Sequence, residues 1–507
     1  MAEPATVALK PYHSLAEIRA DLAAGSVTCA ALVEHYLGRI AANQHLNAFL
    51  EVYADEARQR AVEIDTKLAH GTAGKLAGMV IGLKDVLLYN GHKAQASSRI
   101  LEGFTSLYSG TAVQRLLDAD AIIIGRQNCD EFAMGASNET SSFGPVRNAA
   151  DPSRVPGGSS GGSAVAVQAD LCLASIGSDT GGSVRQPAAF CGVVGLKPTY
   201  GRISRYGLIA YASSFDQIGP ITKTVDDAAL LLEVMAGPDE FDATASLREV
   251  PTYSELLTPA GPRRLAYLRD ALEREGLAPA VRTAFERTLD VLRAAGHAVE
   301  AVDLPILEYL VPTYYLLTTA EASSNLSRFD GVKFGYRSPN ATDLESLYKK
   351  TRAEGFGPEV QRRIILGTFV LSADYYDAYY TQAQRVRRLI RDRTAALLQQ
   401  YDFLLVPTAP TAAFGLGENT TDKDPLAMYL ADIFTVQASL AGVPAISVPM
   451  GTDEAGLPLG LQIIGPAFGE AGMLAFAREA HALASPPAAS RAQPSVTSVN
   501  VSAPPRA

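Results

Sequence analysis

The stretch that decides the fold runs from residue 157 to residue 198. It begins Gly-Gly-Ser-Ser-Gly-Gly-Ser (157–163) and continues to Asp-Thr-Gly-Gly-Ser (179–183). Each of these two segments places a serine, Ser159 or Ser183, in glycine-rich backbone. Glycine allows several backbone N–H groups to turn toward one point, which is the arrangement that an oxyanion hole requires. The two segments therefore predict a site for amide-bond chemistry.

A lysine upstream completes the candidate site. Lys84 follows the apolar run Val-Ile-Gly-Leu (80–83), which has the length of a buried strand. Burial at the end of such a strand lowers the pKa of a lysine from about 10.4 and leaves a neutral amine that accepts protons. Lys84, Ser159 and Ser183 form the predicted lysine–serine–serine set.

Residues 157–163 have other interpretations. They fit the Gly-x-Ser-x-Gly nucleophile elbow of α/β-hydrolases, but that fold needs a histidine after the serine, and only His297 and His481 follow, without a surrounding signature. A P-loop would require Gly-Lys-Ser/Thr after the glycines. Taken alone, the segment is typical of a structural loop. Its pairing with residues 179–183 and with Lys84 favours the catalytic interpretation.

The composition bounds the protein class. The chain has 507 residues, 47% hydrophobic and 19% charged, which is ordinary for a globular enzyme with a large core. The net charge of −10 argues against a chain that grips RNA by itself. Four widely spaced cysteines indicate neither a zinc site nor a disulfide framework. No signal peptide or span of ~18 apolar residues is evident, and we expect a cytoplasmic protein.

Periodicity predicts an α/β fold in which helices cover one large mixed sheet. We expect 1–75 to form N-terminal packing helices and 76–485 to form the catalytic domain, with a helical insertion around 250–400. A tail at 486–507 has the composition of a disordered segment. The expected strands are 78–83, 121–125, 264–268, 299–302, 403–406, 445–448 and 459–464, and the expected helices include 281–295 and 357–400.

The spacing of these motifs resembles the amidase signature family. Ser159 lies 75 residues after Lys84 and 24 residues before Ser183. Within that family, the amino-acid sequences of residues 177–188, 195–201 and 214–220 are similar to those of the A subunits of glutamyl-tRNA(Gln) amidotransferases. The resemblance covers roughly residues 10–485 and implies the amidase signature fold, with a mixed sheet covered on both faces.

The resemblance also implies residue roles. Ser183 is the expected nucleophile, and Ser159, after a cis peptide bond, is expected to pass its proton to Lys84. The expected donors of the oxyanion hole are the backbone N–H groups of Thr180, Gly181 and Gly182.

Other polar residues have supporting roles in this resemblance. Asp179 and Arg185 are expected to brace the catalytic loop. For the two charged groups of glutamine, the resemblance implies Arg363 for the carboxylate and Asp432 for the ammonium, with Tyr314 as a pocket wall. Arg362 competes with Arg363 for the first role.

The function implied by the resemblance is a glutaminase subunit that supplies ammonia for converting Glu-tRNA(Gln) to Gln-tRNA(Gln), with Asp-tRNA(Asn) as a second candidate acceptor. No nucleotide-binding motif is present, so ATP and Mg are expected on a B subunit, with a C subunit completing a heterotrimer and mischarged tRNA reached through the B subunit. No cofactor or metal site is expected in this chain. The alternatives are a free-standing amidase for other amides and a non-catalytic scaffold.

Overall fold

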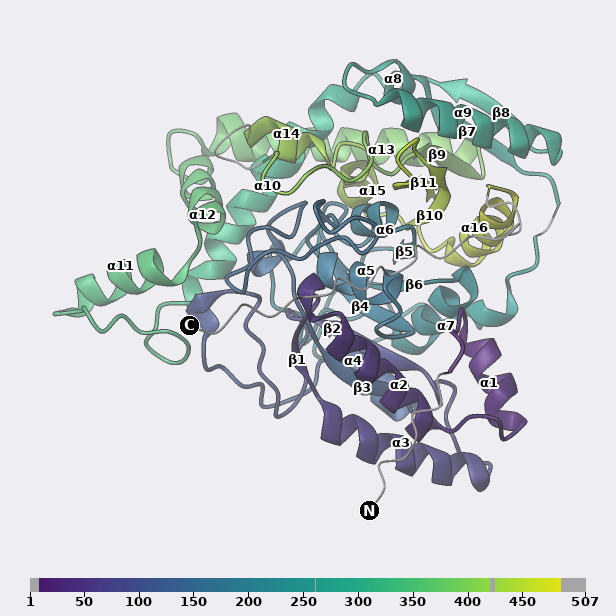
Figure 1. Ribbon diagram of the computed structural model, residues 1–507. Helices are drawn as coiled ribbons and strands as arrows, with labels where there is room; N and C mark the ends of the chain where they lie inside the picture. The colour runs from purple at the N-terminus through teal and green to yellow at the C-terminus, as the bar shows by residue number, and fades with distance from the viewer. Residues whose placement is uncertain (1–8, 260, 420–424, 485–507) are drawn as a thin grey trace, which may run out of the picture.

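The computed structural model describes residues 9–259, 261–419 and 425–484. A single mixed sheet crosses the molecule, and helices pack against it (Figure 1). The strands are β1 (Phe49–Val52), β2 (Val80–Lys84), β3 (Ile122–Gln127), β4 (Ala174–Asp179), β5 (Val194–Lys197), β6 (Gln217–Thr222), β7 (Arg264–Leu268), β8 (Ala298–Val302), β9 (Phe403–Pro407), β10 (Ala445–Thr452) and β11 (Pro458–Ile464).

The helices divide into three groups along the chain. The N-terminal and central helices are α1 (Leu15–Ala23), α2 (Cys29–Ala42), α3 (Ala54–Ala69), α4 (Thr111–Asp118), α5 (Gly161–Gln168), α6 (Arg185–Cys191) and α7 (Val225–Met235). Those of the third quarter are α8 (Arg269–Glu273), α9 (Pro279–Ala294), α10 (Leu310–Asn325), α11 (Leu344–Gly355), α12 (Pro358–Val370) and α13 (Gln382–Gln400). The last are α14 (Pro425–Leu430), α15 (Val436–Ala441) and α16 (Glu470–Ala484). Within the described ranges, no helix is both long and apolar enough to cross a bilayer.

The strand order is β1-β3-β2-β4-β6-β5-β10-β11-β9-β7-β8. β2 runs parallel to both β3 and β4, whereas β4, β6, β5, β10, β11 and β9 pair antiparallel in that order. β7 is parallel to β8 and β9. The predicted mixed α/β sheet is therefore confirmed, and the segment 1–75 contributes an edge strand, β1, besides its three helices.

The connections around β2 explain how helices come to cover both faces. The crossover through α4 leads from β2 to β3, and the crossover through α5 leads from β3 back past β2 to β4. Because both are expected to be right-handed and run in opposite directions across the sheet, α4 and α5 belong on opposite faces. α5 packs with α6, whereas α4 packs with α7, which also contacts α16.

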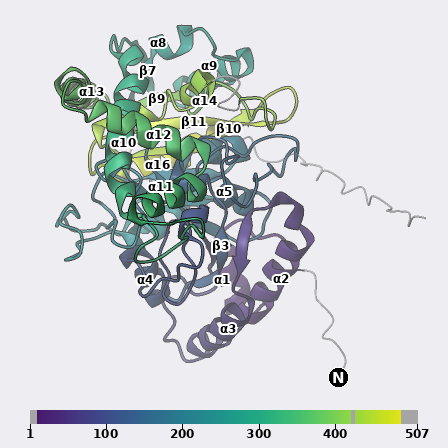
Figure 2. The ribbon, with the colours of Figure 1, turned by 90° about the vertical axis from the view of Figure 1, so that its left-hand side faces the viewer.

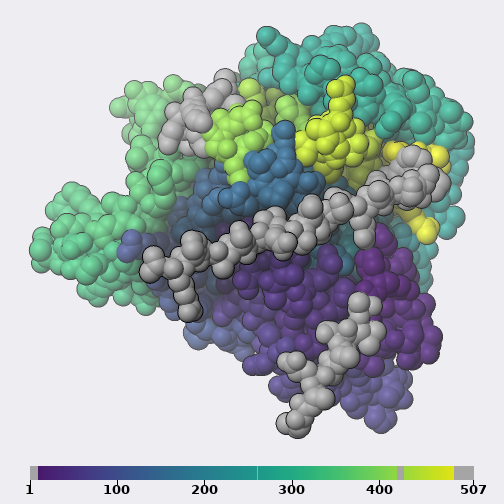
Figure 3. Space-filling view, viewed as in Figure 1, coloured from purple at the N-terminus to yellow at the C-terminus, as the bar shows by residue number. Residues whose placement is uncertain are grey.

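The sheet places the chemistry at one edge. β2 and β4 are parallel neighbours, so their carboxyl ends, at Lys84 and Asp179, lie together. The segment between β8 and β9 is mostly helical, and Figure 2 shows α10, α12 and α11 stacked in front of the sheet. In Figure 3 the part that holds α11 forms a lobe projecting from the molecule at the left.

Candidate active site

Lys84 ends β2 with its side chain fully buried. Its Nζ lies 2.7 Å from Ser159 Oγ, 2.9 Å from Ser160 Oγ and 3.0 Å from Ser178 Oγ. The predicted contact between Lys84 and Ser159 is thus present. Ser160 and Ser178 were not expected as partners.

Burial lowers the pKa of Lys84 to about 8, and the nearby carboxyl groups of Asp130, Asp179 and Asp216 partly oppose this shift. A neutral amine has one lone pair and two hydrogens. The hydroxyls of Ser160 and Ser178 can accept hydrogen bonds from the two N–H groups of a neutral amine. Its lone pair would then face the Ser159 hydroxyl.

Ser159 follows a cis peptide bond, Gly158–Ser159, which the family resemblance implied. Its carbonyl oxygen accepts a hydrogen bond from the backbone N–H of Asp130 at 3.2 Å. The Asp130 carboxylate in turn accepts the N–H of Asn138 at 2.9 Å. A Cβ on Gly158 would lie 2.1 Å from Asp130 Oδ2, so this close approach requires glycine.

The loop after β4 presents Ser183, which is 6% exposed. Its glycines fit between larger side chains: a Cβ on Gly181 would lie 2.5 Å from the Tyr314 hydroxyl, and one on Gly182 would lie 2.2 Å from Thr435 Oγ1. Gly182 also has a φ angle of +147°, which residues with a side chain rarely adopt.

Backbone donors are available in the same loop. Among the described residues, none accepts a hydrogen bond from the backbone N–H groups of Thr180, Gly181 and Gly182. Buried N–H groups are seldom left unpaired. Free amides at this position match the donors expected for an oxyanion hole.

Asp179 and Arg185 brace the loop, as expected from the sequence. The fully buried guanidinium of Arg185 donates to Asp179 through Nε at 2.9 Å and through Nη2 at 2.8 Å. It also donates to the carbonyl oxygen of Thr435 at 2.8 Å. These charge-assisted bonds hold the pKa of Asp179 below its usual value despite burial.

The two serines are not joined in this structure. Across the described residues, no hydrogen bond connects the side chains of Ser159 and Ser183. A backbone bond does connect their segments, because Ser160 N–H donates to the carbonyl oxygen of Ser183 at 3.1 Å. Of the two contacts in the predicted relay, the structure has the hydrogen bond between Lys84 and Ser159 but, among the described residues, not the one between Ser159 and Ser183.

Arg363 lies on α12 and is buried among three tyrosines. Its Nε donates to Glu359 Oε1 at 2.8 Å, and its Nη1 donates to the Tyr211 hydroxyl at 2.9 Å. The guanidinium carbon lies 5.3 Å from the ring centre of Tyr315 and 5.8 Å from that of Tyr429. This side chain is held in one position at the site.

Arg362 has a different environment. Its side chain is 37% exposed, and its Nη1 lies 2.6 Å from Glu359 Oε2. The buried position of Arg363 makes it the better candidate for binding a carboxylate.

Asp432 is 5% exposed, and no hydrogen bond to its Oδ1 is found in the described part of the chain. Burial raises its pKa to about 8, and the charge of Asp179 adds to this effect, against the lowering by Arg363 and Arg185. An unpaired buried carboxylate oxygen costs free energy unless a cation reaches it. Asp432 thus fits the expected role of binding an ammonium group.

Asp216 is a further buried acid that the sequence did not single out. It accepts the Thr180 hydroxyl at 2.6 Å and the backbone N–H of Tyr211 at 2.9 Å. It thereby connects the first residue of the oxyanion loop with the tyrosine that contacts Arg363. Burial raises the pKa of Asp216 to about 6.

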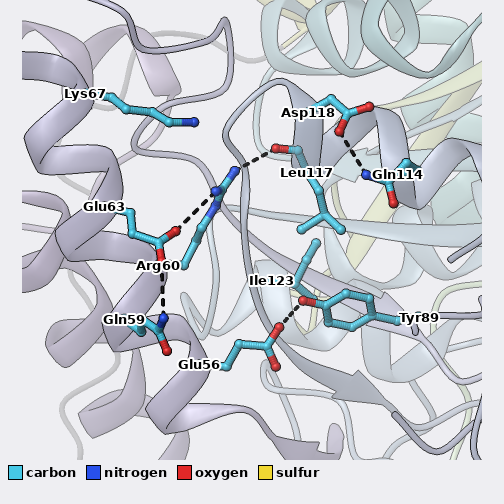
Figure 4. A pocket seen from close by; sticks show the side chains of 10 residues that line it. All are labelled: Glu56, Gln59, Arg60, Glu63, Lys67, Tyr89, Gln114, Leu117, Asp118 and Ile123. Carbon is cyan, nitrogen blue, oxygen red and sulfur yellow. Dashed lines mark hydrogen bonds and ion pairs between the residues drawn. The ribbon is translucent and has the colours of Figure 1, made fainter. Parts of the chain in front are cut away.

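A hollow of about 550 Å³ lies elsewhere, between α3 and α4 (Figure 4). Its lining is polar and internally paired: the Tyr89 hydroxyl donates to Glu56, and Arg60 donates to Glu63 and to the carbonyl oxygen of Leu117. None of the predicted site residues lines it.

The single mixed sheet and the buried lysine–serine pair beside a glycine-rich serine loop are the features expected of an amidase. Comparison with known proteins agrees. The chain belongs to the amidase family, whose model matches residues 31–474, and within it to the glutamyl-tRNA(Gln) amidotransferase A subunits.

Three relatives support this placement. The chain is 52% identical to the A subunit of the glutamyl-tRNA(Gln) amidotransferase of Chlorobium luteolum, over 92% of this chain and 96% of that protein. The crystal structure of the corresponding protein from Thermotoga maritima is 43% identical, covers 88% of this chain and 90% of its own, and superposes with a TM-score of 0.73. The native peptide amidase of Stenotrophomonas maltophilia is 30% identical, with coverage of 92% and 96% and a TM-score of 0.77.

Proposed function

We propose that this chain is the glutamine-hydrolysing subunit of a tRNA-dependent amidotransferase. The observation that carries the proposal is the fully buried Lys84 amine, 2.7 Å from Ser159 Oγ, beside a loop that presents Ser183. Relatives named as amidotransferase A subunits, half identical over nearly the whole chain, support the choice of glutamine.

In the proposed mechanism, Ser183 Oγ attacks the side-chain amide carbon of glutamine. Its proton passes to Ser159 as the proton of Ser159 passes to the neutral Lys84 amine. The backbone N–H groups of Thr180 and Gly181, with that of Gly182, hold the oxyanion. The carbon–nitrogen bond then breaks, the proton returns through Ser159 to the leaving ammonia, and water hydrolyses the acyl-enzyme by the same route. The first step requires Ser183 and Ser159 to come into hydrogen-bond contact when substrate binds.

Glutamine is recognised by the two charged groups on its α-carbon in this proposal. Arg363 binds the α-carboxylate and Asp432 the α-ammonium, with Tyr314 forming the wall nearest the catalytic loop. The buried guanidinium and the unpaired Asp432 oxygen support this assignment. Two fixed charges in a packed site orient the amide toward Ser183.

The ammonia would be used by partner chains. We place ATP and Mg on a B subunit, which would also hold the mischarged Glu-tRNA(Gln), or Asp-tRNA(Asn), while a C subunit completes a cytoplasmic heterotrimer. The net charge of −10 supports the assignment of tRNA binding to another chain. The domain boundaries proposed for the sequence, at residues 75 and 485, would leave the whole site in one catalytic domain.

The test uses the complex purified from its native host. Ser183→Ala is expected to abolish glutamine-dependent amidation of Glu-tRNA(Gln) and to leave amidation supplied with free ammonium unchanged, because only the ammonia source is lost. The exposed Ser327→Ala is the matched control. Glutamine turnover that survives in Ser183→Ala would exclude Ser183 as the nucleophile.

The alternative of a free-standing amidase is tested on the same preparation. Propionamide lacks both charged groups and gains nothing from Arg363 or Asp432, so wild type should prefer glutamine strongly. Equal turnover of the two amides, unaffected by Arg363→Ala, would favour a general amidase.

A further inference from the structure

Glu131 is a buried acid outside the proposed machinery that touches the helix carrying Arg363. It is 1% exposed and follows Asp130 in a short 3₁₀ turn, Glu131–Ala133. Its Oε2 and Oε1 accept the backbone N–H of Gly357 at 2.9 and 3.1 Å. The Ser98 hydroxyl also donates to Oε1.

Gly357 is the N-cap residue of α12, and that helix has no capping side chain of its own. Glu131, more than two hundred residues away in the sequence, accepts the backbone N–H of this N-cap residue, as an N3 side chain does in a capping box. A carboxylate at this end also interacts favourably with the helix dipole. The contact leaves no room for a side chain, because a Cβ on Gly357 would lie 2.4 Å from Glu131 Oε2.

Asp130, the residue that precedes Glu131, contacts the backbone of Ser159. The backbone N–H of Asp130 donates to the carbonyl oxygen of Ser159 at 3.2 Å. Two consecutive residues therefore bind the backbone of Ser159 and the N-terminus of α12. Arg363 lies six residues along α12 from Gly357, which corresponds to about 9 Å of helix.

We propose that Glu131 is a positioning residue for substrate recognition: its carboxylate fixes the start of α12 to the Ser159 segment, so that Arg363 stands at a constant distance from the reacting serines. This inference rests on the proposed function. Phe132 supports the same junction, since its ring lies 5.6 Å from that of Phe356, edge to face.

The experiment compares Glu131→Gln with wild type in glutamine hydrolysis by the purified complex. The substituted side chain keeps the size of Glu131 but has no charge. We therefore expect KM for the substrate glutamine to rise about tenfold, which corresponds to the loss of one charge-assisted hydrogen bond, and kcat to stay within about twofold of wild type. Inactivation of Ser183 by phenylmethanesulfonyl fluoride, a neutral reagent that does not need Arg363, should keep its wild-type rate. Glu345→Gln, at an exposed glutamate of α11, is the control.

Coupling to Arg363 separates positioning from a general loss of structure. In an Arg363→Ala background, Glu131→Gln should raise KM no further. If Glu131→Gln does not fold, Ser98→Ala removes one donor to the same carboxylate and should raise KM about threefold. An unchanged KM in the folded variant, or equal losses in glutamine turnover and sulfonylation, would overturn the inference. Wild-type complex without glutamine turnover would instead refute the proposed function.

Discussion

The pH dependence of glutamine hydrolysis should change its slope when Asp432 is replaced by Asn. In the proposed mechanism two groups of the free enzyme must lose a proton before catalysis, because Lys84 would act as a neutral amine and Asp432 would bind ammonium as a carboxylate. Burial brings the pKa of each to about 8, by lowering that of Lys84 and raising that of Asp432. Both requirements reduce kcat/KM as the pH falls.

The magnitude follows from the two titrations. A group with a pKa of about 8 is about one-eleventh deprotonated at pH 7 and one-half at pH 8. Two such groups raise kcat/KM about 30-fold between these values, and one raises it about fivefold. Wild type should therefore give the steep profile and Asp432→Asn the shallow one. In the substrate complex the bound ammonium keeps Asp432 ionised, so the wild-type kcat should already follow the shallow profile.

The assay is ammonia release from glutamine between pH 6 and 9, at substrate concentrations well below and well above KM. Asp374→Asn, at an exposed aspartate, should retain the steep wild-type profile of kcat/KM. A steep profile that persists in Asp432→Asn would show that Asp432 does not titrate with binding. A kcat without pH dependence below 8 would remove Lys84 from the role of base.

Two further predictions concern the relay and the loop. Lys84→Arg should lower kcat by at least about a hundredfold and should not recover at high pH, because guanidinium stays protonated; activity near wild type would mean that Lys84 supplies only charge. Gly182→Ala places a Cβ 2.2 Å from Thr435 Oγ1 at φ +147° and should cost about a hundredfold in kcat, whereas Gly38→Ala, with open space around it, should be neutral. If the loop has moved in Gly182→Ala, sulfonylation of Ser183 should also be slower. An unchanged kcat would contradict the close contact between position 182 and Thr435.

The strands that could be predicted are those with at least three apolar residues in succession. β2, β3 and β9 lie in such runs because both of their faces are covered, and β7 lies at its predicted residues. The position of Lys84 at a strand end followed from the same pattern. Its contact with Ser159 required the family resemblance as well.

The strands at the centre of the sheet, β4, β5 and β6, were not predicted because glycine, proline or polar residues leave no three apolar residues in succession within any of them. These glycines serve close packing: a Cβ on Gly177 would lie 2.8 Å from Ser160 Oγ, one on Gly195 2.6 Å from Ala188 Cβ, and one on Gly219 2.1 Å from the Leu196 carbonyl oxygen. β6 also contains Pro220, a residue that argues against a central strand, and its ladder with β5 stops before that proline.

The unpredicted polar residues share another cause. Ser178 and Ser160 reach Lys84, and Asp216 reaches Thr180, through contacts between segments that only the folded sheet brings together. The contact of Glu131 with Gly357 spans 226 residues. No local pattern encodes such pairs. Ser178 offered the one available signal, since it precedes Asp179 at the end of β4.

A second buried lysine, Lys197, shows that a lowered pKa alone does not single out Lys84. The proposal of Lys84 as the base rests more on its hydrogen-bond partners. Lys197 is also fully buried, and burial lowers its pKa to about 7, below that of Lys84. Its Nζ, however, donates to the carbonyl oxygens of Pro198 at 2.9 Å and Val443 at 2.7 Å. Carbonyl oxygens accept hydrogen bonds but have no proton to give. Lys84 Nζ lies within 3.0 Å of three hydroxyls, which both donate and accept, so in the proposed mechanism a proton can pass from Ser183 through Ser159 to Lys84. A lowered pKa makes either lysine a better base, but only the hydroxyl neighbours give Lys84 a proton to accept.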